Sequence, residues 1–263
     1  MMQVRIALLL CLSIGMAGCG SSSKKNTSSG GPVSGNWQMA LLPNGKTLAK
    51  KQSGFLLQSG SAVTGNVLFL DPPCSGIGSV TGSVNGTNVS LAINPTGVQI
   101  SLTGTIGSDQ ASMSGTFTLL QAGCSGTSAA PLAGTWTANL VAPLNGTIQG
   151  SFTSKEGVVY QVGSGSTLSQ GPNTGVSSVP LAGNISVSSD TPYCFTGATI
   201  TGSVSGTALA LNLLNADGTQ LGNMNGTTSL DGTSVTGTYS ILAQGTGTGA
   251  CGGGDGGTFT FSL

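Results

Sequence analysis

The stretch Cys74-Ser-Gly-Ile-Gly-Ser-Val-Thr-Gly-Ser-Val-Asn-Gly-Thr recurs 120 residues further along the chain as Cys194-Phe-Thr-Gly-Ala-Thr-Ile-Thr-Gly-Ser-Val-Ser-Gly-Thr. A second matched block contains Gly104-Thr105 and, at an offset of 122, Gly226-Thr227. Each block is followed by one more cysteine, Cys124 or Cys251. The sequence therefore predicts a tandem duplication in which each repeat carries two thiols of its own.

The residues inside each repeat alternate with period 2, the pattern of a β-strand with one buried face. Leu209, Leu211 and Leu213 alternate with small or polar residues, and Asn85-Gly86 and Asp231-Gly232 suit two-residue hairpin turns. This pattern predicts an all-β fold of antiparallel meanders. Four strands are expected between the cysteines of each repeat, at 78–84, 88–93, 98–106 and 112–120 and at 198–204, 207–214, 219–227 and 233–242.

Glycines recur on the inward side of these strands, at Gly82, Gly104 and Gly115 and at their copies. A missing side chain there permits sharp coiling or close backbone approach. A sheet with one apolar face also needs closure or a second layer, so each repeat is expected to form a barrel of seven or eight strands. A pair of immunoglobulin-like sandwiches is the rival, disfavoured because both cysteines of a pair are expected in rim loops rather than in facing strands.

Residues 1–18 have the features of a secretory signal peptide, because Arg5 precedes an apolar run that is too short to span a membrane. The end of this segment, Met16-Ala17-Gly18-Cys19, resembles the lipobox of bacterial lipoproteins, although Met stands where Leu is commoner. The resemblance implies cleavage before Cys19, lipidation of its sulfur and a place in the cell envelope. An ordinary cleavage site with a chance cysteine is the alternative.

The stretch 19–34 is rich in Ser and Gly, which predicts a flexible linker that holds the body away from the membrane. By resemblance to Gram-negative lipoproteins, Gly20 directly after the lipidated cysteine implies export to the outer membrane. The expected membrane partner is therefore reached through the N-terminal lipid.

With Cys11 in the signal peptide and Cys19 lipidated, four of the six cysteines remain. Four antiparallel strands return the chain to the rim where it began, so disulfides are expected between Cys74 and Cys124 and between Cys194 and Cys251. Two isolated thiols per repeat cannot build a tetrahedral metal site without histidine. Neither a metal nor a cofactor is expected.

The two expected domains, 35–130 and 131–263, open with Gly35-Asn36-Trp37 and, a few residues inside the second, Gly134-Thr135-Trp136. Gly-x-Trp at the head of a first strand resembles the lipocalins, eight-stranded barrels that often carry apolar ligands, although the mature chain lacks the arginine that lipocalins place against this tryptophan. The resemblance implies a barrel shape. Trp37 and Trp136 are expected to be core residues that plug the barrel ends.

The ends of the two repeats differ. A clear final strand at 257–263 follows Cys251, whereas only 125–131 follows Cys124. The first barrel is therefore expected to be the less complete one, with its open edge covered by the strand that begins at Gly134 in a seam shared by the repeats. The segment 160–179, rich in Gly and Ser, is expected to be an extended loop.

The composition excludes several classes of function. Charged residues make up 5% of the chain, and the mature chain has six lysines and no arginine against seven acidic residues, a net charge of −1. No basic patch is available for a phosphate backbone, so no nucleic-acid partner is expected. The chain also has no histidine, the usual general base and metal ligand.

These features favour a non-enzymatic, lipid-anchored envelope protein with a binding, adhesion or structural role, whose partner would be an envelope component. The alternative is a carrier that encloses a small apolar ligand inside a lipocalin-like barrel, for which an apolar cavity would be needed. An enzyme acting on carbohydrate is the third hypothesis. It would need a cleft with two facing carboxylates about 5 to 10 Å apart, whereas Asp109 and Asp231 occupy matched turns where Asp is favoured for backbone reasons.

Overall fold

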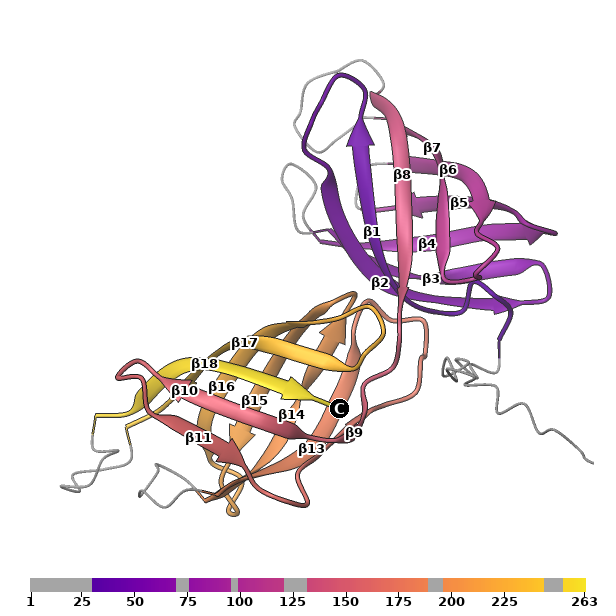
Figure 1. Cartoon of the computed structure of the whole chain (residues 1–263). Coiled ribbons are helices and arrows are strands. Elements are labelled where there is room, and N and C mark those ends of the chain that lie inside the picture. Colours follow the sequence, from indigo (N-terminus) through magenta and orange to yellow (C-terminus); the bar gives the residue numbers. More distant parts are fainter. Residues whose placement is uncertain (1–29, 70–75, 96–98, 121–131, 189–195, 244–252) are drawn as a thin grey trace, which may run out of the picture.

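The computed structural model describes residues 30–69, 76–95, 99–120, 132–188, 196–243 and 253–263. These residues form an all-β structure of two closed antiparallel barrels, each with eight strand positions. Figure 1 shows the two barrels as separate bodies, with the chain passing from the first to the second directly after β8. No helix that could cross a membrane is found among the described residues.

The first barrel is a meander in which each strand pairs with its neighbours in sequence and the last strand pairs with the first. Its strands are β1 (Gly35–Pro43), β2 (Lys50–Ser59), β3 (Ala62–Phe69), β4 (Gly76–Asn85), β5 (Asn88–Asn94), β6 (Gln99–Ile106), β7 (Ser112–Leu120) and β8 (Leu132–Val141).

The second barrel repeats this meander with interruptions. Its strands are β9 (Asn145–Thr147), β10 (Gln149–Ser154), β11 (Val159–Val162), β12 (Thr167–Gln170), β13 (Val179–Ser188), β14 (Gly197–Ser205), β15 (Ala208–Leu214), β16 (Gln220–Thr228), β17 (Ser234–Ile241) and β18 (Asp255–Ser262). The ring closes where β11 pairs with β13 and β10 with β18.

The pairing shows which strands correspond. Gly35 of β1 pairs with Leu56 of β2, and in the second barrel Gly146 of β9 pairs with Leu168 of β12. Beyond these pairs β10 takes over from β9 and pairs with β11. Thus β9 and β10 together replace β1, and β11 and β12 together replace β2. The segment expected to be an extended loop at 160–179 therefore contains two short strands, and its loop is limited to 171–178.

The expectation about barrel completeness is confirmed in one respect and corrected in two. The strand that begins at Leu132 does cover the edge of the first repeat, because β8 pairs with both β7 and β1. It belongs to the first barrel alone, since β18 fills the eighth position of the second, so no seam is shared. The first barrel is also not the less complete one, because its eight strands are unbroken whereas two strands of the second barrel are divided.

The boundary between the two domains lies later in the sequence than expected. Seven strands precede Cys124, and an eighth is needed to pair both open edges, so the first barrel continues through β8 to Val141 rather than ending at residue 130. Trp136 therefore lies on a closing strand, where its counterpart is Phe259 of β18. The two occupy matching registers, because Trp136 is paired with Leu41 and Phe259 with Phe152.

The inward side chains of each barrel pack into a contiguous apolar cluster. Trp37 and Trp136, at 0% and 1% exposure, lie in the same cluster inside the first barrel rather than one in each repeat. The inward glycines bring backbones together as expected. A Cβ built on Gly104 or Gly115 would collide with the backbone of the neighbouring strand, so neither position opens a cavity toward the barrel axis.

Candidate functional site

The candidate covalent sites of the chain lie outside the described residues. Cys19, at the proposed lipobox, and the four cysteines expected to form disulfides, Cys74, Cys124, Cys194 and Cys251, all fall in segments that the structure does not describe. Lipidation and both disulfide pairings therefore stay predictions.

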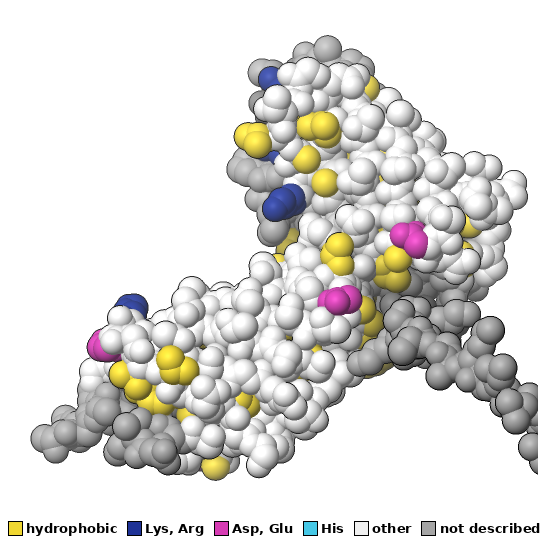
Figure 2. Space-filling view, viewed as in Figure 1, with side chains coloured by type: hydrophobic (Ala, Val, Ile, Leu, Met, Phe, Trp, Pro, Cys, Tyr) yellow, Lys and Arg dark blue, Asp and Glu magenta, His cyan; other side chains and the backbone are white. Residues whose placement is uncertain are grey.

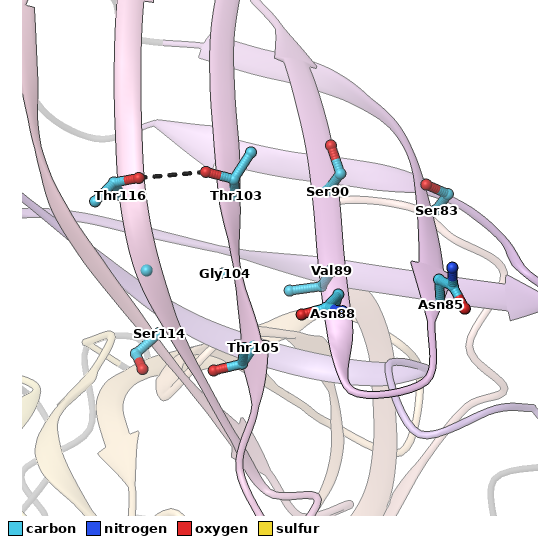
Figure 3. A pocket seen from close by; sticks show the side chains of 11 residues that line it. Ser83, Asn85, Asn88, Val89, Ser90, Thr103, Gly104, Thr105, Ser114 and Thr116 are labelled. Carbon is cyan, nitrogen blue, oxygen red and sulfur yellow. Dashed lines mark hydrogen bonds between the residues drawn. The ribbon is translucent and has the colours of Figure 1, made fainter.

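A grid of polar side chains covers the outer face of β4 to β7 in the first barrel (Figure 3). Cross-strand pairing places these side chains in two rows. One row is Ser83, Ser90, Thr103 and Thr116, and the other is Asn85, Asn88, Thr105 and Ser114. All eight residues are exposed, and they line a shallow groove of about 740 Å³ together with Val89, Gly104 and Gly115.

The grid arises directly from the strand pattern. Outward positions in these strands carry Ser, Thr or Asn, and successive outward residues on one strand meet their partners on the next strand in register. Only Thr103 and Thr116 bond to each other within the grid, with 3.2 Å between their hydroxyl oxygens. The remaining hydroxyl and amide groups can therefore donate to and accept from an external partner.

One of the two tryptophans, Trp136, lies beneath the grid. The indole Nε1 of Trp136 donates to the backbone oxygen of Thr103 across 3.1 Å, and Trp136 pairs with Gly115 in the β7–β8 ladder. The buried indole therefore contacts the backbone of β6 at Thr103, a residue that also lines the groove.

The corresponding face of the second barrel is less polar. At the 120-residue offset of β4 and β5, Ala208 and Ala210 of β15 stand where the first barrel has Asn88 and Ser90. Ser205, the counterpart of Asn85, is buried against the first barrel. The continuous grid is therefore a property of the first repeat.

A polar joint connects the two barrels. Asn36 of β1 donates through Nδ2 to the backbone oxygen of Gly206 at 2.8 Å, and its Oδ1 accepts from the Gly206 amide at 2.7 Å. Gln38 accepts through Oε1 from the amide and the hydroxyl of Thr207, both at 3.2 Å. The hydroxyls of Ser53 and Ser205 lie 2.8 Å apart.

The loop 171–178 completes the joint. Asn173 donates through Nδ2 to the backbone oxygen of Leu56 at 2.9 Å, and Asn66 donates to that of Gly175 at 2.6 Å. This loop replaces the tight β2–β3 turn of the first repeat. It is therefore the longer connection of the second repeat that binds the first barrel.

One aromatic side chain inserts across the joint. Phe55 lies on β2 of the first barrel, is 1% exposed, and belongs to the apolar cluster of the second barrel. Its counterpart in the second barrel is Thr167, which is exposed. The joint thus combines one large apolar contact with paired hydrogen bonds that are buried at Asn36 and Ser53 and part-buried elsewhere.

Three charged residues gather at one rim of the second barrel. Lys155, Glu156 and Asp255 line a pocket of about 540 Å³ with Tyr160. Asp255 is held by hydrogen bonds, because its Oδ2 accepts from the Tyr239 hydroxyl at 2.7 Å and its Oδ1 from the Gly256 amide at 2.6 Å. Burial raises the pKa of the Tyr160 phenol, with further contributions from the negative charges of Asp255 and Glu156.

Other acidic residues serve as turn caps. Asp109 accepts through Oδ1 from the amides of Ala111 and Ser112 and from the Ser112 hydroxyl, and the Ala111 amide is the main reason that its pKa is lowered. The Ser229 hydroxyl has the same effect on the pKa of Asp231. The expected backbone role of these two residues is confirmed.

The described residues do not support the carrier hypothesis. The inward side chains of each barrel pack into an apolar cluster, and the groove and the charged pocket lie outside these two cores. Within the same residues, no group of three or more His, Cys, Asp or Glu side chains could hold a metal ion.

Comparison with protein-family models finds no match for the chain, and comparison with curated proteins finds no significant match. Among solved structures, the agglutinin of Burkholderia oklahomensis aligns with 92% of this chain and 99% of its own, at 11% sequence identity and a TM-score of 0.23. A TM-score this low carries no argument about the function of the chain.

Proposed function

We propose that the chain is a non-enzymatic, lipid-anchored binding protein of the bacterial cell envelope. In this proposal the polar grid of the first barrel contacts uncharged, hydroxyl-rich polymers of the envelope or of its surroundings. The observation that carries the proposal is the grid itself, in which eight exposed neutral side chains stand in two rows across four strands.

The chemistry of the grid favours neutral polymers over charged ones. Ser and Thr hydroxyls and Asn amides both donate and accept hydrogen bonds, as the hydroxyls of a glycan do. None of the residues that line the groove is charged, so nothing there would attract a phosphate or a sulfate group. Figure 2 shows that few charged side chains interrupt the face of the molecule that is drawn there.

A non-enzymatic role is supported by the positions of the charged groups. Asp109, Asp217 and Asp231 are engaged in turns, and both oxygens of Asp255 accept hydrogen bonds from the protein. A glycosidase needs one carboxyl that is free to protonate the leaving group and a second that acts as base or nucleophile. Among the described residues, Asp255 and Glu156 are the carboxylates that line the charged pocket, and Asp255 is committed to structural hydrogen bonds.

The anchor is the second element of the proposal. Cleavage before Cys19 would leave a lipidated N-terminus, and the residues from there to Gly30 would tether the barrels to the membrane. Labelled palmitate should enter the wild-type protein in a bacterial host and should be absent from Cys19→Ser. Label that persists in this variant would show that the lipid is elsewhere.

Binding is tested by affinity electrophoresis in gels that contain neutral glucans, mannans or chitin oligomers, with alginate and heparin as anionic comparisons. The wild type should be retarded by at least one neutral polymer. Asn88→Ala/Ser90→Ala gives the grid the residues of the second barrel and should abolish most of the retardation. The matched control Thr236→Ala/Thr238→Ala removes two exposed hydroxyls from the second barrel and should leave it unchanged. Equal retardation of both double variants would rule out the grid as the contact surface.

A further inference from the structure

A cleft between the two barrels is a third hollow of the surface, besides the groove of the grid and the charged pocket. It has a volume of about 410 Å³ and is bounded by β1 and β2 of the first barrel, by the connection after β8, and by the start of the loop 171–178. Clefts of this size between domains are the usual places for small ligands. This cleft exists only because the barrels are joined.

Two amide side chains in the cleft are held in a fixed orientation. The carbonyl oxygen of Asn145 accepts from the Gln170 backbone amide at 2.9 Å, and that of Gln170 accepts from the Leu144 amide at 3.2 Å. Because the oxygens are used in this way, the other end of each group must be its NH2. Within the described part of the chain these two nitrogens have no hydrogen-bond partner, so the cleft offers two oriented donors.

The other amides of the cleft are already satisfied. Asn173 donates to Leu56 and accepts from the Gly175 amide, and Gln58 accepts from the Val33 amide and donates to the Gly60 oxygen. They fix the walls rather than offering new contacts. Among the amides of the cleft, Asn145 and Gln170 are therefore the ones whose donors the geometry leaves free to recognise a ligand.

The remaining lining defines the character of that ligand. Leu57, Pro143 and Pro172 give the cleft apolar surface, and none of its lining residues is charged. An ionic ligand would lose its hydration there without gaining an opposite charge. A ligand that fits must be uncharged, must carry oxygen acceptors for the two amides, and must present carbon-bound hydrogens to the proline and leucine side chains.

We infer that the inter-barrel cleft binds a neutral saccharide of one or two rings, with Asn145 and Gln170 donating to its oxygens. A saccharide combines hydroxyl acceptors with an apolar ring face, as the lining requires. A peptide fits less well, because its backbone N–H groups would be buried where the side-chain oxygens are already engaged. This site goes beyond the proposed polymer contact on the grid and does not depend on it.

The test uses isothermal titration and saturation-transfer NMR of the mature chain with maltose, cellobiose, lactose and diacetylchitobiose. At least one of them should bind the wild type. Asn145→Asp and Gln170→Glu retain the accepting oxygen but replace the donor with a negatively charged oxygen, so each should weaken binding by about tenfold or more, the loss of one hydrogen bond. Asn225→Asp, which adds the same charge on the exposed face of β16, is the control and should leave the affinity unchanged.

The outcomes separate this inference from the proposed function. No binding of any of the four disaccharides, or equal affinity of the wild type and both cleft variants, would overturn the cleft assignment. Saccharide binding that is lost in Asn88→Ala/Ser90→Ala but kept in Asn145→Asp and Gln170→Glu would place the site on the grid. That result would overturn the cleft and leave the proposed function standing. Melting temperatures of the two cleft variants show whether each is folded, and the loss must appear in both.

Discussion

The two barrels share one meander but differ in their first two strands. In the first barrel β1 and β2 run unbroken, whereas in the second each is divided into two short strands. The second barrel also has the longer loop 171–178 in place of the tight turn at Gly60. Of these irregular parts, the loop 171–178 lies against the first barrel, so this difference between the repeats contributes to the joint and to its cleft.

The break in the second strand is a small insertion stabilised from within. The residues 163–166 interrupt the strand between β11 and β12. Ser166 is buried, donates through its hydroxyl to the Gly163 oxygen at 2.9 Å and accepts from the Ser186 amide at 2.9 Å. The Ile148 amide, between β9 and β10, donates to the Ser166 backbone oxygen. The hydrogen bond from Ile148 to Ser166 therefore links the interruption between β9 and β10 to the interruption between β11 and β12.

The largest effect is expected from replacing the aromatic residue of the joint with its counterpart. Phe55→Thr removes a fully buried ring from the second barrel's core and should cost about 3 kcal/mol of unfolding free energy. Calorimetry should show one cooperative transition for the wild type and two for the variant. Leu102→Ala, in the core of the first barrel, should destabilise the protein without separating the barrels. Two transitions already in the wild type would mean that the barrels are not coupled.

A matched pair of glycines distinguishes the stability contributed by the joint from the effect of the turn conformation. Gly86 and Gly206 occupy the same hairpin position, with φ of 60° and 56°. A Cβ on Gly86 meets open space, whereas one on Gly206 would collide with Gln38 and Ser53 of the other barrel. Gly86→Ala should cost about 1 kcal/mol for its left-handed backbone, and Gly206→Ala distinctly more. Urea unfolding measures both, and equal losses would contradict the tight contact.

A smaller effect, a gain in stability, is expected at Gln52, whose buried side-chain oxygen has no hydrogen-bond partner among the described residues. The matching position in the second barrel is Val162, since Gln52 pairs with Phe69 and Val162 with Val187. Gln52→Met keeps the length of the side chain and removes the unpaired oxygen, so it should stabilise the protein by about 1 kcal/mol. A loss of stability in thermal unfolding would indicate that the amide is satisfied in solution.

The smallest effect is expected from the two matched turn aspartates, Asp109 and Asp231. Hydrogen bonds lower the pKa of each carboxyl in the folded state, so each contributes stability that is present above 3.8, the ordinary pKa of an aspartate, and is lost as the pH falls through the folded-state value. Asp109→Asn and Asp231→Asn should each reduce the fall in melting temperature between about pH 5 and pH 2. The two variants should behave alike, and an opposite sign in either would refute the assigned role.

The sequence predicts the strands of the cysteine blocks closely because their signals are local. The strand expected at 112–120 is β7 (Ser112–Leu120), and those expected at 88–93 and 207–214 match β5 and β15 within one residue. Alternation and hairpin dipeptides define these elements without reference to distant parts of the chain.

The partner of a strand is not a local property, and there the prediction was wrong. Trp37 and Trp136 have the same Gly-x-Trp context, which suggested that both head a first strand. Trp136 instead lies on a closing strand, and its true counterpart is Phe259, a likeness visible in Gly134-Thr135-Trp136 and Gly257-Thr258-Phe259. Comparing the ends of the repeats would have revealed it.

The sequence analysis does not predict the joint, because most of its residues are of the same types as those on the rest of the surface. Asn36, Ser53 and Ser205 are of the types that cover the exposed faces of both barrels. One signal was present, since Phe55-Leu56-Leu57 breaks the alternation of β2 and places apolar side chains on both of its faces. Adjacent apolar side chains on the outward face of a strand, here Phe55 and Leu57, indicate a second buried contact.

We expect the two barrels to form one rigid unit through this joint. Residual dipolar couplings of the backbone amides in a weakly aligned sample measure the orientation of both barrels at once. A single alignment tensor should fit the couplings of residues 35–141 and 145–262 together, with the barrels placed as in Figure 1. Two tensors of clearly different magnitude would show that the barrels move independently, and would contradict both the joint and the cleft between them.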